Sequence, residues 1–340
     1  MEELSPIAWK VSVRLDRLGW VGKGRIAWIR EDAIMKKAKA GTIGRRMLIT
    51  AILLVCHYTL GLQAGRVQAS AAQGRAMWVW GSARPLITDK GQWDAFFALC
   101  GAPKGEPANR IARLFVWASP LVVGEDGEKA ALKAFIAECH GRGIRVDMLD
   151  GDPGWALPEG ADGLDTLVET FASWQRDNPV ASRFDGLQLD IEPYLLPGWP
   201  NKPLMDGWVA AATKAKAAIG AADLGLAIPV WLDQKQFGNL NKPLQGASDY
   251  VALMDYRDTA ASIVADALGE LRTAEALGKG VYVGVETQDV RGDPPSVTFY
   301  QEGNARMEAE LAKARAKLEG YGAFKGFAIH HLDSYRAMKP

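Results

Sequence analysis

Residues 184–194 read Phe-Asp-Gly-Leu-Gln-Leu-Asp-Ile-Glu-Pro-Tyr, in which polar and apolar side chains alternate. Because a β-strand places successive side chains on opposite faces, Gln188, Asp190 and Glu192 should share one face. Three polar side chains on one strand face would be costly inside an apolar core. They are typical of a strand that lines a cleft, where two carboxyl groups could act as a general acid and its partner, as in glycoside hydrolysis. The alternative is an acidic turn that follows a buried strand.

The elements that would position these groups are short apolar runs that alternate with amphipathic helical patterns after Gln73. Eight such repeats of strand and helix predict an α/β protein with a (β/α)8 TIM barrel. The fifth connection, residues 233–248, shows no clear helix. An open doubly wound sheet is the alternative, but no glycine-rich fingerprint follows the first strand. The predicted strands are residues 76–80, 111–119, 145–150, 186–192, 225–232, 250–256, 281–286 and 326–331.

The ends of these strands carry polar and aromatic side chains, which suits a carbohydrate cleft because barrel chemistry occurs at the carboxyl ends of the strands. Tryptophan rings at this rim could stack on sugars or could simply pack the barrel. A histidine there could bind substrate hydroxyl groups or be structural. The candidate residues are Trp80, Trp117, Asp147, Asp150, Gln188, Asp190, Glu192, Trp231, Met254, Tyr256, Glu286 and His330.

The stretch from Asp185 to Glu192 resembles the strand-four signature of family 18 glycoside hydrolases, the chitinase-like barrels, which reads Asp-Gly-x-Asp-x-Asp-x-Glu. The resemblance implies that Glu192 is the general acid and that Asp190 orients the N-acetyl group of the substrate. One position departs from the signature, because Gln188 stands where the family has its middle Asp. That Asp helps to cycle the proton of its neighbour, so the mechanism is expected to be weakened or altered here.

Met254-Asp-Tyr256 resembles the strand-six Met-x-Tyr motif of the same family. The resemblance implies that Tyr256 contacts the reacting acetamido group. The family's strand-three Ser-Gly-Gly pattern is missing, and Met148-Leu-Asp-Gly-Asp-Pro153 stands in its place. The expected substrate is therefore a polysaccharide or glycoconjugate that contains N-acetylated amino sugars.

Two other functions remain open on the sequence. Ile191-Glu192-Pro193 resembles the Asn-Glu-Pro acid/base site of retaining β-glycosidases, in which Glu286 would be the nucleophile about 5 Å away. Against this, Ile191 replaces the Asn and could not hydrogen-bond a sugar hydroxyl. A catalytically silent, lectin-like barrel that only binds carbohydrate is the third function, and Gln188 is the kind of change that could accompany such a loss.

The composition excludes several other classes of function. Lys plus Arg and Asp plus Glu number 40 each, so no net field attracts nucleic acid or an anionic membrane. The sequence contains no phosphate-binding loop, no Cys or His set with metal-ligand spacing and no Gly-x-Ser-x-Gly elbow. We therefore expect no cofactor and no metal, although Asp150 and Asp152 could hold a cation with Asp190.

The N-terminal part of the chain predicts an export signal. A basic run at residues 35–46 precedes an apolar stretch at 47–60 and small-residue sites at 67–71. We expect residues 1–34 to be an over-long gene start or an extension, 35–71 a signal peptide or membrane anchor, and 72–340 the catalytic barrel. The protein would then be periplasmic or secreted, with no membrane partner beyond such an anchor. Cys100 and Cys139 would pair or stay free thiols.

Overall fold

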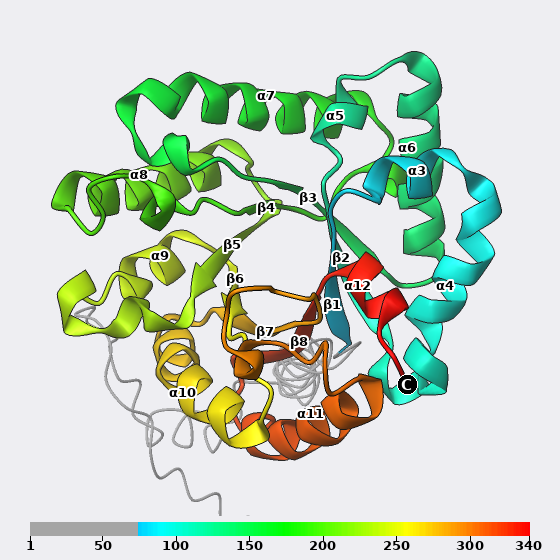
Figure 1. The fold of residues 1–340 in the computed structure, drawn as a ribbon. Coiled ribbons are helices and arrows are strands. Elements are labelled where there is room, and N and C mark those ends of the chain that lie inside the picture. The colour runs from blue at the N-terminus through cyan, green and yellow to red at the C-terminus, as the bar shows by residue number, and fades with distance from the viewer. Residues whose placement is uncertain (1–73) are drawn as a thin grey trace, which may run out of the picture. The chain divides into compact units, whose positions relative to one another are not determined.

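Eight parallel strands pair in sequence order, and the eighth pairs with the first to close a barrel (Figure 1). The computed structural model describes residues 74–340. It confirms the predicted (β/α)8 barrel of the α/β class. The strands are β1 (Arg75–Val79), β2 (Ile111–Val116), β3 (Arg145–Asp150), β4 (Gly186–Leu189), β5 (Asp223–Pro229), β6 (Tyr250–Met254), β7 (Gly280–Glu286) and β8 (Phe324–His330).

Helices surround the barrel and cover the outer face of its strands (Figure 1). The helix α11 has the bounds predicted from the sequence, and the strand β3 does as well. The helices are α3 (Ala83–Thr88), α4 (Trp93–Gly101), α5 (Ser119–Val122), α6 (Asp126–Gly141), α7 (Ala161–Asp177), α8 (Lys202–Ala218), α9 (Asn241–Ala247), α10 (Ala260–Leu277), α11 (Asn304–Leu318) and α12 (Leu332–Ala337).

The fifth connection contains a helix that the sequence analysis missed. The helix α9 has only seven residues, with Pro243 in its first turn and Gly246 near its end. Proline is tolerated there because the first amide groups of a helix have no partner within it. So short a helix shows no periodic pattern, although Leu244 is fully buried. The predicted fifth strand was also too long, since β5 ends at Pro229.

The expectations for residues 1–34 and 35–71 lie outside the described residues. Within residues 74–340, no helix is both long and apolar enough to cross a membrane.

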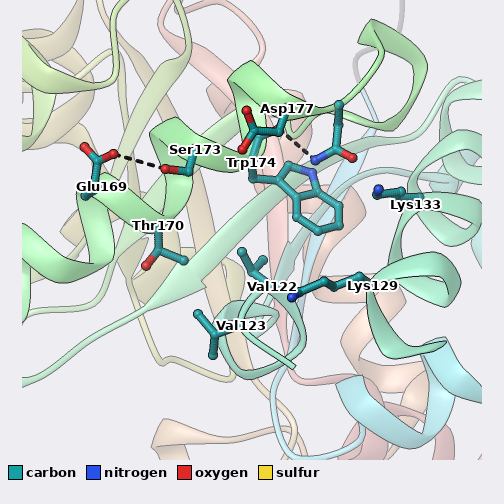
Figure 2. A pocket seen from close by; sticks show the side chains of 10 residues that line it. Val122, Val123, Lys129, Lys133, Glu169, Thr170, Ser173, Trp174 and Asp177 are labelled. Carbon is teal, nitrogen blue, oxygen red and sulfur yellow. Dashed lines mark hydrogen bonds between the residues drawn. The ribbon is translucent and has the colours of Figure 1, made fainter. Parts of the chain in front are cut away.

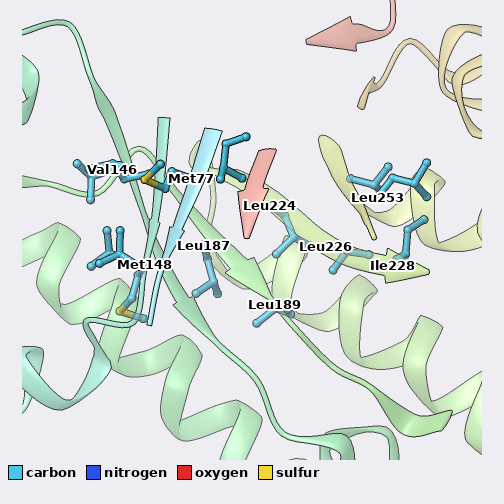
Figure 3. Packing of buried hydrophobic residues seen from close by; sticks show 14 of the residues in the cluster. Met77, Val146, Met148, Leu187, Leu189, Leu224, Leu226, Ile228 and Leu253 are labelled. Atoms are coloured by element: carbon cyan, nitrogen blue, oxygen red, sulfur yellow. The ribbon is translucent and has the colours of Figure 1, made fainter. Parts of the chain in front are cut away.

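The main core lies between the outer face of the barrel and the helices. Its members include Met148, Leu187, Leu189 and Leu226, each from one of three neighbouring strands (Figure 3). These side chains are fully buried, and burial of each contributes about 1.5–3 kcal/mol relative to exposure. The opposite face of the same strands is thereby directed into the barrel, which sets the direction of Gln188.

Cys100 and Cys139 lie in this helical layer, and each is a free thiol. Cys100 is in α4, Cys139 is in α6, and each is buried. Burial raises the pKa of Cys100 to about 12, so its thiol stays protonated and unreactive. Of the two outcomes left open by the sequence, the structure shows the unpaired one.

The inside of the barrel is filled mainly by aromatic side chains. Trp78, Phe115 and Tyr250 form a buried cluster, in which the Trp78 and Phe115 ring centroids are 5.2 Å apart. Gly225 makes room for this cluster, because a Cβ atom there would overlap the phenol ring of Tyr250. The barrel is therefore a packed core below the level of the strand ends.

An ion pair lies at the bottom of this packed interior. The Arg113 Nε donates to Asp147 Oδ2 at 2.8 Å, and the hydroxyl of Tyr250 donates to the same oxygen. A second Arg113 nitrogen donates to Asp223 at 2.9 Å. The sequence placed Asp147 among the rim residues, and this was wrong, because the side chain is completely buried near the amino ends of the strands. Its role is structural.

Replacement Asp147→Asn should lower the free energy of unfolding by about 3 kcal/mol, because it removes one charge of a buried pair and leaves Arg113 poorly compensated. Urea denaturation measures this. The matched control is Asp165→Asn, which breaks a half-exposed pair with Lys214 and should cost no more than about 0.5 kcal/mol. Equal costs for the two variants would contradict the structural role of Asp147.

Candidate active site

Apart from Asp147 and the more deeply placed Gln188, the structure places the candidate residues at the carboxyl ends of the strands or in the turns that follow them. Asp190, Glu192, Tyr256, Glu286 and His330 come from four different strands. Their charges act on one another: Glu286, Asp190 and Glu192 all raise the pKa of the deeply buried Tyr256, after burial itself. The barrel therefore brings these five residues together around its mouth.

Asp190 is the most strongly perturbed acid of this group. It follows β4 directly, and its amide donates to the Asp150 carbonyl at 3.0 Å. Gly151 lies against the Asp190 backbone, where any Cβ atom would overlap the carbonyl group. One carboxyl oxygen, Oδ1, is buried without a hydrogen-bond partner among the described residues. Burial and the neighbouring Glu192 raise the Asp190 pKa to about 7, and His330 opposes this shift.

Glu192 is held by a tyrosine that the sequence analysis did not select. The chain turns at Pro193 into a short 3-10 helix, Pro193–Leu195. This turn brings the hydroxyl of Tyr194 back onto the Glu192 carboxyl group, to which it donates a hydrogen bond. The proline directly after Glu192 is the signal that could have indicated a reversal at this point.

Tyr194 belongs to an aromatic cluster beside Glu192. Its ring centroid lies 5.3 Å from that of Trp231, which in turn lies 4.7 Å from that of Phe237. Trp199 packs against Tyr194 with centroids 6.2 Å apart. Trp231 is on a 3-10 turn after β5, rather than on the strand as predicted. Trp231 therefore belongs to the aromatic cluster against which Tyr194 packs.

Glu286 and His330 form a pair across the ends of β7 and β8. The strand register sets these two residues opposite each other, and His330 Nδ1 lies 2.8 Å from Glu286 Oε2. Glu286 Oε1 accepts the amides of Thr287 and Gln288, both at 2.7 Å. Burial opposes the charge of Glu286, but the His330 and backbone hydrogen bonds lower its pKa below the usual value. Glu286 is therefore an anion whose oxygens are already occupied.

Gln188 lies one step deeper in the barrel than Asp190. Its side chain is fully buried, and neither its amide nitrogen nor its amide oxygen has a hydrogen-bond partner among the described residues. Gln188 therefore does not bond to Asp190 in this structure.

The other candidates surround this centre. Asp150 accepts hydrogen bonds from the Ser119 hydroxyl and from the Gly151 amide. Met254 ends β6 and is partly buried. Trp80 packs on the barrel interior, whereas Trp117 is 40% exposed. Trp117 is therefore the one of the three candidate tryptophans best placed to meet a ligand from solvent.

A pocket outside the barrel is not part of this centre. Its volume is about 420 Å³, and it lies among α5, α6 and α7, with Trp174, Lys129 and Lys133 in its lining (Figure 2). Among residues 74–340, no group of three or more His, Cys, Asp or Glu side chains could hold a metal ion. The chemistry available at the strand ends is that of carboxyl groups, a phenol and an imidazole.

The raised pKa of Asp190 predicts a stability that depends on pH. Between pH 4 and pH 7 the folded protein retains a proton that the unfolded chain has lost, so stability falls as pH rises. Replacement Asp190→Asn removes this loss and should raise the free energy of unfolding at pH 8 by roughly 2–4 kcal/mol. The gain should disappear near pH 4.

Chemical denaturation of both proteins from pH 4 to pH 8 measures the difference. The control is Asp206→Asn on the exposed face of α8, which should show no such trend. A constant difference between wild type and Asp190→Asn at all pH values would contradict the raised pKa.

Comparisons with known proteins support the fold. No protein-family model and no curated protein matches the chain. A GH18 chitinase from Pseudoalteromonas aurantia aligns at 11% identity with a TM-score of 0.50, over 78% of this chain and 98% of that one. A chitinase from Bacteroides thetaiotaomicron aligns at 13% identity with a TM-score of 0.49, over 78% and 93%. The first likeness supports the closed (β/α)8 barrel fold that the alternation of strands and helices predicts.

Proposed function

We propose that this protein is a glycoside hydrolase that cleaves a polysaccharide or glycoconjugate containing N-acetylated amino sugars. Glu192 is the general acid, Asp190 orients the acetamido group and Tyr256 contacts it. The observation that carries the proposal is the convergence of these three side chains at the mouth of a (β/α)8 barrel, where the Asp190 pKa is about 7. The likeness to a chitinase fold agrees with it. Export from the cytoplasm is part of the proposal and depends on residues 35–71 alone.

The arrangement suits a reaction in which the substrate supplies its own nucleophile. The Asp190 carboxylate accepts the N–H of the acetamido group and holds the acetamido oxygen towards the anomeric carbon. That oxygen forms a bond to the carbon as the glycosidic bond breaks, and Glu192 gives its proton to the leaving oxygen. Glu192 then takes a proton from a water molecule, whose oxygen bonds to the same carbon as the bond from the acetamido oxygen to that carbon breaks. This step restores the acetamido group and releases the sugar.

The geometry does not favour Glu286 as a nucleophile. Its Oε1 accepts two backbone amides and its Oε2 contacts His330, so neither oxygen is free to attack. Its side chain is only 3% exposed. A retaining mechanism through Glu192 and Glu286 would require these contacts to break first. The contacts of Glu286 instead suit a residue that positions His330.

Replacement Glu192→Gln should abolish turnover and leave carbohydrate binding intact, because it keeps the shape of the side chain and removes its acidic proton. Mass spectrometry of products measures turnover on chitin, partly deacetylated polyglucosamine, galactosaminoglycans and plain β-glucans. The control is Glu159→Gln, on an exposed turn after β3, which should cleave like the wild type.

Each outcome separates the candidate functions. Cleavage by the wild type that is confined to N-acetylated chains supports the proposal, whereas cleavage of plain glucans points to the Glu192 and Glu286 pair. Binding without cleavage in both proteins indicates a lectin. Substantial hydrolysis by Glu192→Gln would refute Glu192 as the acid.

Replacement Tyr194→Phe should lower kcat/KM roughly tenfold, because it removes the hydroxyl group that donates to Glu192 and keeps the ring in its cluster. Steady-state kinetics on the cleaved substrate measure the effect. The control Tyr300→Phe alters a half-exposed tyrosine and should have no effect. An unchanged kcat/KM for Tyr194→Phe would show that this hydrogen bond does not position the acid.

A further inference from the structure

We propose that the aromatic cluster beside Glu192 binds the sugar on the leaving-group side of the bond that is cleaved, with Trp199 and Phe237 as the contact surface. This inference rests on the proposed function, in which Glu192 gives its proton to the oxygen of a leaving sugar. It adds to that function a second sugar site, so that the protein would select the sugar that leaves as well as the one held at Asp190.

The cluster is built from two segments at the carboxyl ends of neighbouring strands. Tyr194 and Trp199 lie between β4 and α8, and Trp231 and Phe237 lie between β5 and α9. The Trp199 and Phe237 rings are stacked, with centroids 5.9 Å apart and planes inclined by 25°. The Trp199 and Trp231 centroids are 6.1 Å apart. Because both segments follow strand ends, the cluster lies on the side of the barrel that carries Glu192.

One side of the cluster is fixed by buried packing and the other meets solvent. Trp208 on α8 is fully buried, and its ring centroid lies 6.3 Å from the centroids of both Tyr194 and Trp199. Trp199 and Phe237 pack against the core but are only partly buried. Leu195, which follows Tyr194, is 62% exposed. Trp208 is therefore the base of the cluster, and the other side chains present an apolar surface on which a sugar ring can stack.

The hydrogen bond from Tyr194 connects this surface to the acid. The Tyr194 hydroxyl donates to the Glu192 carboxyl group, and the Tyr194 ring packs against Trp199 and Trp231. One side chain thus separates the acid from the cluster. Asp190 lies in the opposite direction along the chain, directly after β4, with one carboxyl oxygen buried. The order Asp190, Glu192, Tyr194 therefore runs from the barrel interior to the aromatic surface.

This order determines which sugar the cluster can meet. A general acid protonates the oxygen that joins two sugars, so its carboxyl group lies close to that oxygen and the two sugars extend to either side of it. In the proposed function, the sugar whose acetamido group bonds to Asp190 is the one that remains after the first step. The sugar that leaves must then lie beyond Glu192, where the aromatic surface is.

A transfer reaction tests this site separately from the strength of the acid. The donor is the glycosyl fluoride of the N-acetylglucosamine disaccharide, whose carbon–fluorine bond breaks as the acetamido oxygen bonds to the anomeric carbon, and fluoride leaves with the electron pair. A hydroxyl oxygen of added disaccharide then bonds to that carbon as the bond from the acetamido oxygen breaks, and its proton goes to Glu192. Water competes for the same carbon and the same base. The ratio of transfer to hydrolysis therefore reports binding of the accepting sugar.

The variants Phe237→Leu and Trp199→Leu should each lower the ratio of transfer to hydrolysis roughly tenfold, because each removes a ring on which the accepting sugar stacks. Fluoride release should stay within about twofold of the wild type. Two variants are used in case one does not fold, and Trp199→Phe should keep most of the ratio because it keeps a ring. Mass spectrometry of the tetrasaccharide and disaccharide products measures the ratio, and a fluoride electrode measures use of the donor.

The matched control is Tyr321→Leu, which removes a partly exposed ring just before β8, at the amino ends of the strands, and should leave the ratio unchanged. An unchanged ratio in folded Phe237→Leu and Trp199→Leu, or an equal loss in Tyr321→Leu, would overturn the inference. So would a wild type that releases fluoride but transfers nothing to the added disaccharide. In these cases the proposed function stands. A wild type that releases no fluoride would refute the proposed function, and the inference with it.

Discussion

The burial of one carboxyl group, that of Asp190, is the constraint on which the site depends. A carboxyl group removed from water and placed beside Glu192 loses its charge unless something compensates it. In this chain burial and the neighbouring Glu192 together raise the Asp190 pKa to about 7. The group can therefore exist in both protonation states near neutral pH, which is what a residue that binds and releases an amide N–H in a catalytic cycle requires.

The barrel supplies the rigidity that this arrangement needs. Below the mouth, Trp78, Phe115 and Tyr250 fill the interior, and the pair of Arg113 with Asp147 ties neighbouring strands together. Gln188 lies between this packed floor and Asp190. A buried carboxyl group and an unpartnered amide both cost stability, and the large apolar layer outside the barrel offsets that cost. This cost in stability is concentrated at the residues that are proposed to carry out the chemistry.

Much of this could be predicted from the sequence, because strand alternation and strand–helix repetition are local properties. Gln188 lies in β4 as predicted, but the predicted strand over residues 186–192 was too long: β4 ends at Leu189, so Asp190 and Glu192 lie in the turn that follows it. The sequence does not reveal how deeply a residue lies in the barrel or how neighbouring strands align with each other. Asp147 and Asp150 belong to one predicted strand, yet Asp147 binds Arg113 in the buried interior and Asp150 lies at the rim.

Pairings between neighbouring strands could not be predicted from the sequence either, and nor could short turns and helices. The pairing of Glu286 with His330 depends on how β7 and β8 align in the closed barrel. The hydrogen bond from Tyr194 depends on the turn at Pro193. The helix α9 was missed because about two turns that contain a proline and a glycine show no periodic pattern.

The most direct test of the account is a crystal structure of the Glu192→Gln variant with a chito-oligosaccharide bound. The account predicts that the acetamido group of one sugar lies between Asp190 and Tyr256, with its N–H on the Asp190 carboxyl group and the glycosidic oxygen within hydrogen-bond reach of residue 192. A sugar bound with its acetamido group away from Asp190, or bound only outside the barrel mouth, would contradict it.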